Sequence, residues 1–199
     1  MRSLPVVVLC LAGIVGLATA CSSGSGEGGP QPAGSTASTS AAPVSGVPKV
    51  AHPLDASKFE AAPCSSVTAS QLDALAVPSA SRDAQQDVTG TGCVWSAGTG
   101  TAANGMYLTW DTSHTNGLGW VYQAGSTWTY WVPLTVNGYP AVQGGTVDNR
   151  QTGSCTIYVG VSDQLVFILT YKGSLLPQES KPCQLATQAA TDVVQNLGG

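Results

Sequence analysis

Four cysteines spaced over the last two thirds of the chain restrict how its folded part can be arranged. The chain has six cysteines, and two of them lie in an N-terminal segment typical of export, which leaves an even number for the folded part. In an exported protein such a set predicts two disulfides. Zinc ligation is poorly supported, because the chain has only two histidines and no C-x-x-C motif. The four residues are Cys64, Cys93, Cys155 and Cys183.

Four cysteines allow three pairings. We favour the two pairs that are local in sequence, Cys64 with Cys93 and Cys155 with Cys183. Each would close a loop of nearly thirty residues, which stabilises a fold by about 3.5 kcal/mol when only chain entropy is considered. Each pair would also join the start of an expected helix to an expected strand.

The first 20 residues have the features of an export signal. Arg2 provides a short positive start, and residues 4–17 form an apolar run that is too short to cross a membrane as a helix. The run ends in Leu17-Ala18-Thr19-Ala20-Cys21, which resembles the lipobox of bacterial lipoproteins. The alternative is an ordinary secretory signal that is cleaved after Ala20 and leaves Cys21 unmodified.

The lipobox resemblance implies a signal peptide of residues 1–20 and a lipid anchor at Cys21. Cys21 would become the new N-terminus and carry a thioether-linked diacylglycerol with acyl chains such as palmitate. Two or more acyl chains hold a protein stably on a membrane, whereas one chain does not. We therefore expect the protein on the extracytoplasmic face of the cell membrane, with the membrane as its first partner.

Residues 21–58 have the composition of a flexible tether. Ser, Gly, Ala, Pro and Thr dominate this segment, and it has almost no large apolar residue before Val44. Such a segment cannot bury enough apolar surface to offset the entropy lost on folding. His52, near its end, is expected to be solvated. The folded domain is expected over residues 59–199.

Alternation of apolar and polar residues predicts strands in the domain. It is clearest where Met106, Leu108 and Trp110 alternate with the residues between them, and again from residue 155 to 161. Asn137-Gly138 is a strong hairpin-turn signal. The expected strands cover residues 92–97, 106–111, 127–136, 139–143, 155–161 and 164–171, with the last in the centre of the sheet.

Two helices are expected on either side of these strands. Thr68 and Gln71 fit a capping box at the start of a short helix that Pro78 stops. Residues 182–197 form the best helical pattern, and Gly198 is placed to end it. One stripe of this helix is apolar, so it should lie on a face of the sheet. The stripe consists of Leu185, Ala186, Ala189, Val193 and Leu197.

The order of elements predicts an α+β fold. Strands follow one another instead of alternating with helices, which indicates an antiparallel sheet packed by a short N-terminal helix and a C-terminal helix. Residues 114–125 remain ambiguous between a glycine-weakened helix and a loop. Two disulfides complete the expected architecture.

Five short motifs occur in a recognisable order along the domain. They are Pro63-Cys64-Ser65-Ser66-Val67-Thr68, Cys93-Val94-Trp95, Gly138-Tyr139-Pro140-Ala141, the strand that contains Cys155, and Pro182-Cys183-Gln184-Leu185-Ala186. Together with the lipobox, they resemble the actinobacterial lipoproteins grouped as domain of unknown function 3558, over residues 61–197.

The family resemblance implies an envelope lipoprotein with no assigned activity and no catalytic residues to transfer. The four cysteine positions match the family pattern, which strengthens the disulfide prediction. Similar proteins also suggest a helix in the middle of the domain. The region 114–131 is rich in Trp and Gly, which weakens the support for this middle helix here.

The sequence contains no constellation that indicates catalysis, a metal site or a cofactor. Asp111 and His114 could pair, but a single Asp-x-x-His is weak support for nucleophilic catalysis, and His114 is interpreted as a solvated loop residue. No G-x-S-x-G motif is present. Other carboxylates are interpreted as turn-forming or solvated residues, namely Asp83, Asp87, Asp148 and Asp163. We expect a protein that is not an enzyme.

A cluster of aromatic residues is the most unusual feature of the domain, and it comprises Trp120, Tyr122, Trp128, Tyr130 and Trp131. Flat aromatic faces can bind sugars or lipid chains. The alternative is that these residues form core, because a chain with only two Phe needs Trp for core volume. Strand alternation would place Trp128 and Tyr130 on the face opposite to Trp131.

These observations limit the classes of function. A net charge of −4 with only seven Lys and Arg argues against nucleic acid as a partner. We expect a membrane-anchored extracytoplasmic protein that binds an envelope protein, glycan or lipid without catalysis. One alternative is a glycan- or lipid-binding module with an aromatic surface, and another is a hydrolase accessory or inhibitor domain.

Overall fold

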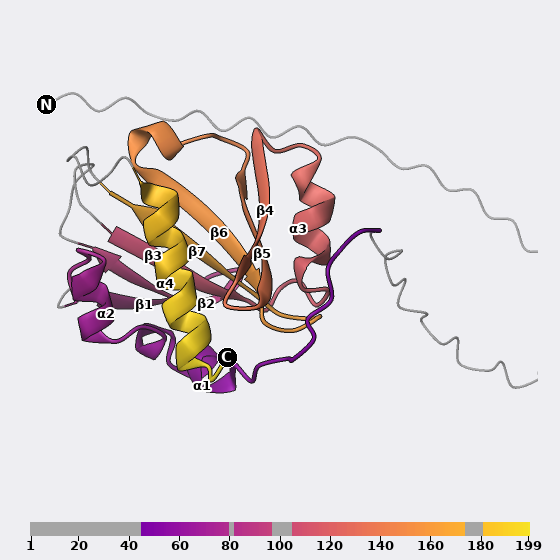
Figure 1. Cartoon of the computed structure of the whole chain (residues 1–199). Coiled ribbons are helices and arrows are strands. Elements are labelled where there is room, and N and C mark those ends of the chain that lie inside the picture. Colours follow the sequence, from indigo (N-terminus) through magenta and orange to yellow (C-terminus); the bar gives the residue numbers. More distant parts are fainter. Residues whose placement is uncertain (1–44, 80–81, 97–104, 174–180) are drawn as a thin grey trace, which may run out of the picture. The chain divides into compact units, whose positions relative to one another are not determined.

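The computed structural model describes residues 45–79, 82–96, 105–173 and 181–199 (Figure 1). The expected signal, Cys21 and most of the tether lie outside the described residues. None of the helices in these ranges combines the length and the apolar character that a membrane span requires.

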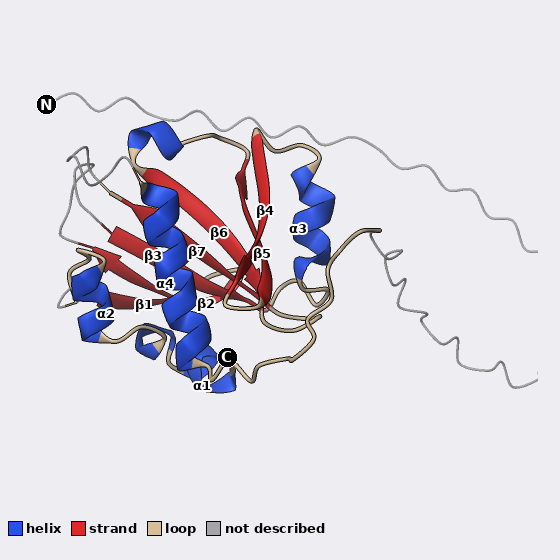
Figure 2. Ribbon diagram, viewed as in Figure 1, coloured by secondary structure: helices blue, strands red, loops and turns tan. Residues whose placement is uncertain are grey.

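A seven-stranded antiparallel sheet forms the centre of the domain (Figure 2). The strands follow the order β1-β2-β3-β7-β6-β5-β4, so β7 is central, as its apolar sequence predicted. The strands are β1 Arg82–Gln86, β2 Gly90–Ser96, β3 Gly105–Asp111, β4 Tyr130–Val136, β5 Tyr139–Gly145, β6 Ser154–Gly160 and β7 Val166–Lys172. The antiparallel α+β prediction is confirmed.

Helices lie on both sides of the sheet. In Figure 1, α4 crosses one face of the sheet, whereas α3 lies beside the β4–β5 hairpin, away from α4. The helical elements are α1 Ser57–Ala61, η1 Pro63–Ser65, α2 Ala69–Ala74, α3 Leu118–Gly125, η2 Arg150–Thr152 and α4 Pro182–Asn196.

Helix α2 begins with the predicted capping box. The amide of Gln71 donates to Oγ1 of Thr68 at 3.3 Å, and the amide of Thr68 donates to Oε1 of Gln71 at 2.8 Å. Two amides at the helix start that lack helical partners are thereby satisfied. Leu72 and Leu75 can then turn inward, and both are buried.

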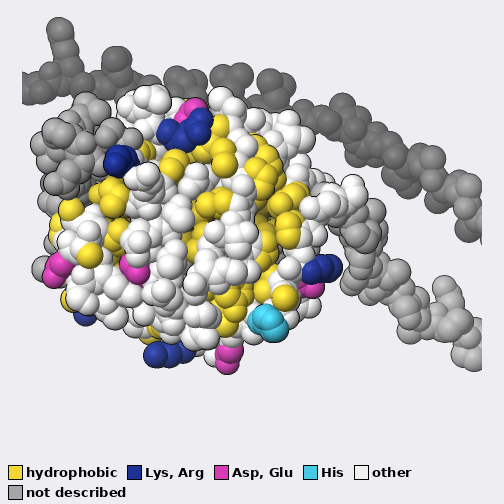
Figure 3. All heavy atoms as spheres, in the orientation of Figure 1, with side chains coloured by type: hydrophobic (Ala, Val, Ile, Leu, Met, Phe, Trp, Pro, Cys, Tyr) yellow, Lys and Arg dark blue, Asp and Glu magenta, His cyan; other side chains and the backbone are white. Residues whose placement is uncertain are grey.

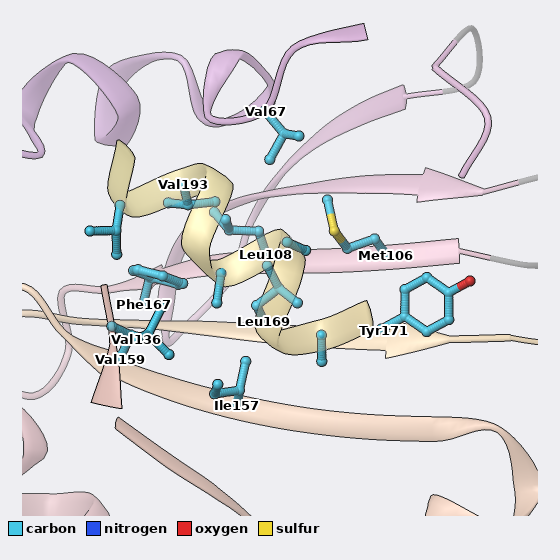
Figure 4. Close-up of a cluster of buried hydrophobic side chains, with 14 of the residues drawn as sticks. Val67, Met106, Leu108, Val136, Ile157, Val159, Phe167, Leu169, Tyr171 and Val193 are labelled. Carbon is cyan, nitrogen blue, oxygen red and sulfur yellow. The ribbon is translucent and has the colours of Figure 1, made fainter. Parts of the chain in front are cut away.

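The main core lies between α4 and the sheet face that it covers. In Figure 4, side chains of β3 and β7, including Leu108, Phe167 and Leu169, gather with Val193 of α4. The small residues of the α4 stripe let the helix approach the strands closely, and Ala186 and Ala189 are fully buried. Large indoles fill the remaining volume, since Trp95 and Trp110 are also fully buried.

Both predicted disulfides are present. Cys64 of η1 bonds to Cys93 of β2, and Cys155 of β6 bonds to Cys183 in the first turn of α4. Each bond joins a helical segment to a strand of the sheet. The two bonds therefore fasten both ends of the domain to its central layer.

The last part of the expected tether packs against the domain. The amide of Val50 donates to the Asp163 carboxylate at 3.0 Å, and Nζ of Lys49 contacts the same carboxylate at 3.1 Å. The amide of Leu54 donates to a carbonyl at the β6–β7 turn, and Ala56 is buried. The packed chain therefore begins before residue 58, because backbone hydrogen bonds that composition does not reveal hold this segment. The His52 side chain is exposed, as expected.

Two elements were not predicted. Residues 118–125, whose sequence was ambiguous between a helix and a loop, form the helix α3, because buried Leu118 and Val121 fasten it to the sheet. Asp83 was expected in a loop but lies in β1, an edge strand whose five residues are all exposed. Its register with β2, not an apolar pattern, makes it a strand.

Candidate functional site

The sheet face opposite α4 carries a second, smaller apolar cluster. Leu118 and Val121 of α3 pack there with Val142 of β5 and Val166 of β7. Around this cluster lie five half-buried aromatic side chains, which we name the aromatic belt. The belt consists of Trp120, Tyr122, Trp128, Trp131 and Tyr158.

Neighbouring rings of the aromatic belt contact each other in sequence. Ring centroids lie 5.7 Å apart for Trp120 and Tyr158, and 4.9 Å apart for Tyr158 and Trp128. The distances are 5.7 Å for Trp128 and Trp131, and 5.0 Å for Trp131 and Tyr122. All four fall in the range of favourable aromatic pairs. The belt is therefore one connected structure.

The sheet opens next to the belt. Pairing between β5 and β6 ends at Gln143 and Ile157, although β5 continues to Gly145 and β6 begins at Ser154. The strand ends enclose an open hollow of about 360 Å³, within the size range of small-molecule sites. We name this space the hollow; it is lined by Trp128, Tyr130, Gly144, Gly145, Thr146, Val147, Asn149, Ser154, Thr156 and Tyr158.

A glycine sets the position of the Trp128 ring at the hollow. A Cβ atom on Gly144 would lie 2.5 Å from the indole, so any larger residue would displace the ring. The neighbouring Gly145 is less restricted, because its Cβ would lie 3.4 Å from Tyr130. Gly144 therefore determines the shape of one wall.

The walls of the hollow carry no ionised side chain at neutral pH among the described lining residues. Burial raises the pKa of Tyr158 to about 12. Burial also raises the pKa of Tyr130, against the opposing effect of a hydrogen bond with the backbone of Thr156. Both phenols remain neutral, so the hollow presents rings, hydroxyls and an amide.

A charged pair flanks the hollow without adding net charge. The guanidinium of Arg150 lies 4.4 Å from the centroid of the Tyr130 ring and donates from Nε to Asp148 at 2.8 Å. Hydrogen bonding from the Arg150 side chain lowers the pKa of Asp148 to about 2. Because the two charges are satisfied by each other, the hollow itself stays neutral.

Asp111 and His114 form the pair that their spacing allowed. Nδ1 of His114 lies 2.9 Å from Oδ2 of Asp111, and the imidazole stacks on Trp120. Oγ of Ser113 lies 3.0 Å from the same Nδ1 atom. A catalytic Ser-His-Asp relay needs the serine and the aspartate on different ring nitrogens, so these three residues do not form one.

The structure gathers four of the five predicted aromatic residues, Trp120, Tyr122, Trp128 and Trp131, in the aromatic belt, whereas Tyr130 lies outside the belt and lines the hollow. The expected alternation holds for Tyr130 and Trp131 but not for Trp128. Trp128 and Trp131 were expected on opposite faces, and their rings are instead in contact. The reason is that β4 begins at Tyr130, so Trp128 lies before the strand and does not follow its alternation. Tyr130 is buried beside the hollow, and the others are half-buried.

Sequence reasoning missed Tyr158 and Gly144. Tyr158 lies between buried Ile157 and Val159, so alternation could have placed it on the face opposite the main core. No local signal could have shown that Gly144 receives the Trp128 ring, because they are on different segments. In the described ranges, no three His, Cys, Asp or Glu residues gather as a metal site would require.

The fold and the site define a disulfide-bonded α+β domain with an aromatic-lined hollow at a split in its sheet. The chain belongs to the family described as "Protein of unknown function (DUF3558)", which matches residues 16–196. Searches of curated proteins and of solved structures find no match to the chain.

Proposed function

We propose that this protein is a lipid-anchored binding protein of the outer face of the cell membrane, and that it binds carbohydrate in the hollow. The observation that carries this proposal is the meeting of the Trp128 and Tyr158 rings with the uncharged polar side chains of Asn149, Ser154 and Thr156 around one space. A sugar ring has an apolar C–H face and a rim of hydroxyls. Aromatic faces suit the first, and hydroxyl and amide groups suit the second.

A lipid chain fits the hollow less well. A buried acyl chain needs an enclosed apolar cavity, because each polar group that loses water without a partner costs free energy. The hollow is open, and Thr146, Asn149, Ser154 and Thr156 contribute polar atoms to its lining. A sugar can replace the water on these groups with its own hydroxyls, so carbohydrate is the preferred ligand class.

The location outside the cytoplasm rests on sequence and covalent structure. The lipobox-like segment ending at Cys21 supports a lipid anchor, and the Ser- and Gly-rich chain after it supports a spacer. Two disulfides suit an oxidising compartment. We propose a binding role without catalysis. On the α4 face in Figure 3, acidic and basic side chains are scattered and form no large patch of one sign, so this face does not favour a highly charged partner.

Carbohydrate binding can be tested with the full lipidated protein in detergent on a panel of immobilised oligosaccharides built from N-acetylglucosamine, glucose, mannose or arabinose. We expect binding to at least one series. Gly144→Ala should reduce it at least tenfold, because the added methyl displaces the Trp128 ring. Val88→Ala is the control, because Val88 is exposed and lies outside the hollow, and it should keep the binding. Absence of binding to every series would overturn the proposal.

The anchor has its own test. Cys21→Ser should prevent incorporation of a labelled fatty acid and move the protein from the detergent phase to the aqueous phase on phase partitioning. The Ser22→Ala variant is the control and should remain in the detergent phase. If Cys21→Ser stays there too, Cys21 is not the attachment point.

A further inference from the structure

A row of side chains leads out of the hollow across the sheet. Thr156 lines the hollow and is the register partner of Thr170 on β7, which in turn is the partner of Tyr107 on β3. Register partners in an antiparallel sheet point to the same face. The neighbours of these residues along each strand, such as Leu108 and Leu169, are buried on the α4 side. The row therefore lies on the opposite face, continuous with the hollow.

This row is accessible and is already arranged for hydrogen bonding. Oγ1 of Thr156 lies 2.9 Å from Oγ1 of Thr170, and both residues are half-buried. Tyr107 is one of the few large side chains with substantial exposure, at 41%. Helix α3 packs over Val142 and Val166, and the row is not part of that cluster.

We infer that the carbohydrate bound in the hollow is a chain of several sugars, and that it continues from the hollow along Thr156, Thr170 and Tyr107. This inference rests on the proposed function. Adjacent strands are about 4.8 Å apart, so the row extends roughly 10 Å from β6 to β3. Each sugar in a linear chain of pyranose units advances the chain by about one strand spacing. The row has room for about two sugars beyond the one in the hollow.

The chemistry of the row favours a sugar chain over a peptide strand. The row consists of two hydroxyl groups followed by an exposed phenol ring. It therefore combines polar groups with an aromatic face, as the hollow does. The row itself contains no acidic or basic side chain, and the exposed Lys172 on the same face of β7 adds one positive charge beside Thr170. A peptide adding to a sheet pairs with the backbone at an edge strand, whereas β3 and β7, which carry Tyr107 and Thr170, are paired on both sides.

The test is the dependence of affinity on chain length. For each oligosaccharide series, dimer to hexamer, dissociation constants are measured by calorimetry with the full lipidated protein in detergent. We expect the affinity of the wild type to rise about tenfold from dimer to tetramer. Tyr107→Ala and Thr170→Val should both reduce this rise, and Tyr107→Ala, the substitution farther from the hollow, should leave the affinity for the dimer unchanged. Val132→Ala, at an exposed residue of edge strand β4, is the control and should keep the rise.

The outcomes separate the inference from the proposed function. If the dimer binds but longer chains bind no better, or if Tyr107→Ala and Thr170→Val keep the full rise, the extended row is wrong while the hollow remains a carbohydrate site. If no member of any series binds, both are wrong. Both variants change exposed or half-exposed side chains, so an unchanged thermal unfolding midpoint will confirm that they fold.

Discussion

The carboxylate of Asp111 is fully buried and lies 2.9 Å from Nδ1 of His114, which fixes the loop that leads into α3. The same carboxylate accepts hydrogen bonds from the amide of Ser113 at 3.1 Å, from its hydroxyl at 2.8 Å and from the amide of His114 at 3.2 Å. The imidazole of His114 then stacks on Trp120 with 4.5 Å between ring centroids. One acid residue at the end of β3 thus positions the first ring of the aromatic belt.

We predict that Asp111→Ala loosens this loop. The substitution removes the acceptor of several hydrogen bonds at once and leaves their donors to water or unpaired, which costs about 1–3 kcal/mol of stability. Hydrogen exchange of residues 112–117 should increase by at least tenfold, and the free energy of unfolding should fall. Asp87→Ala is the matched control, because Asp87 accepts similar bonds from Thr89 and Gly90 but is exposed. Equal effects of the two variants would contradict the role assigned to Asp111.

The disulfide between Cys155 and Cys183 should stabilise the folded domain by about the amount expected of a loop constraint. It holds the first turn of α4 on β6, where Ala186 and Ala189 reach the sheet. Replacing both cysteines by Ala should lower the free energy of unfolding by about 3.5 kcal/mol, as estimated from the 28-residue separation. Equilibrium unfolding in urea measures this change. A loss below about 1 kcal/mol would show that α4 stays in place without the bond.

Local sequence signals were sufficient to predict several strands of the sheet and the helices α2 and α4. The capping box of Thr68 and Gln71, the alternation in β3 and β6, and the stripe of α4 are properties of short sequence windows, and each was confirmed. The cysteine pairing also followed from sequence. Most of these features depend on residues near one another along the chain. The disulfide prediction depends on the even number of cysteines and on the preference for pairs that are local in sequence.

Elements that depend on distant partners could not be predicted in this way. Strand β1 has no apolar pattern and exists because it pairs with β2. Helix α3 is weakened by glycine and is held by the packing of Leu118 and Val121 on the sheet. The hollow exists because β5 leaves β6 after Gln143, which is a property of register between two strands. The aromatic residues were identified from sequence, but not the space that they line.

A buried carboxylate in α4 gives a prediction for pH dependence. Asp192 is 7% exposed, and burial raises its pKa above the ordinary value of 3.8, although a hydrogen bond from Gln188 acts in the opposite direction. A raised folded-state pKa means that the folded protein holds the proton more tightly than the unfolded chain does. The stability from this group is therefore complete below about pH 3.8 and is lost as the pH rises through the folded-state pKa.

Asp192→Asn should remove this loss. In the wild type, Nε2 of Gln188 donates to Oδ1 of Asp192 at 3.1 Å. The asparagine amide keeps an oxygen that can accept this hydrogen bond, but it does not ionise. We therefore expect the variant to be more stable than the wild type at pH 7 and to show no such gain at pH 3, when both are compared by urea unfolding. Asp73→Asn, at an exposed residue of α2, is the control and should show no gain at pH 7. A gain at pH 3 as large as that at pH 7 would show that better packing, not the removal of a buried charge, accounts for the change.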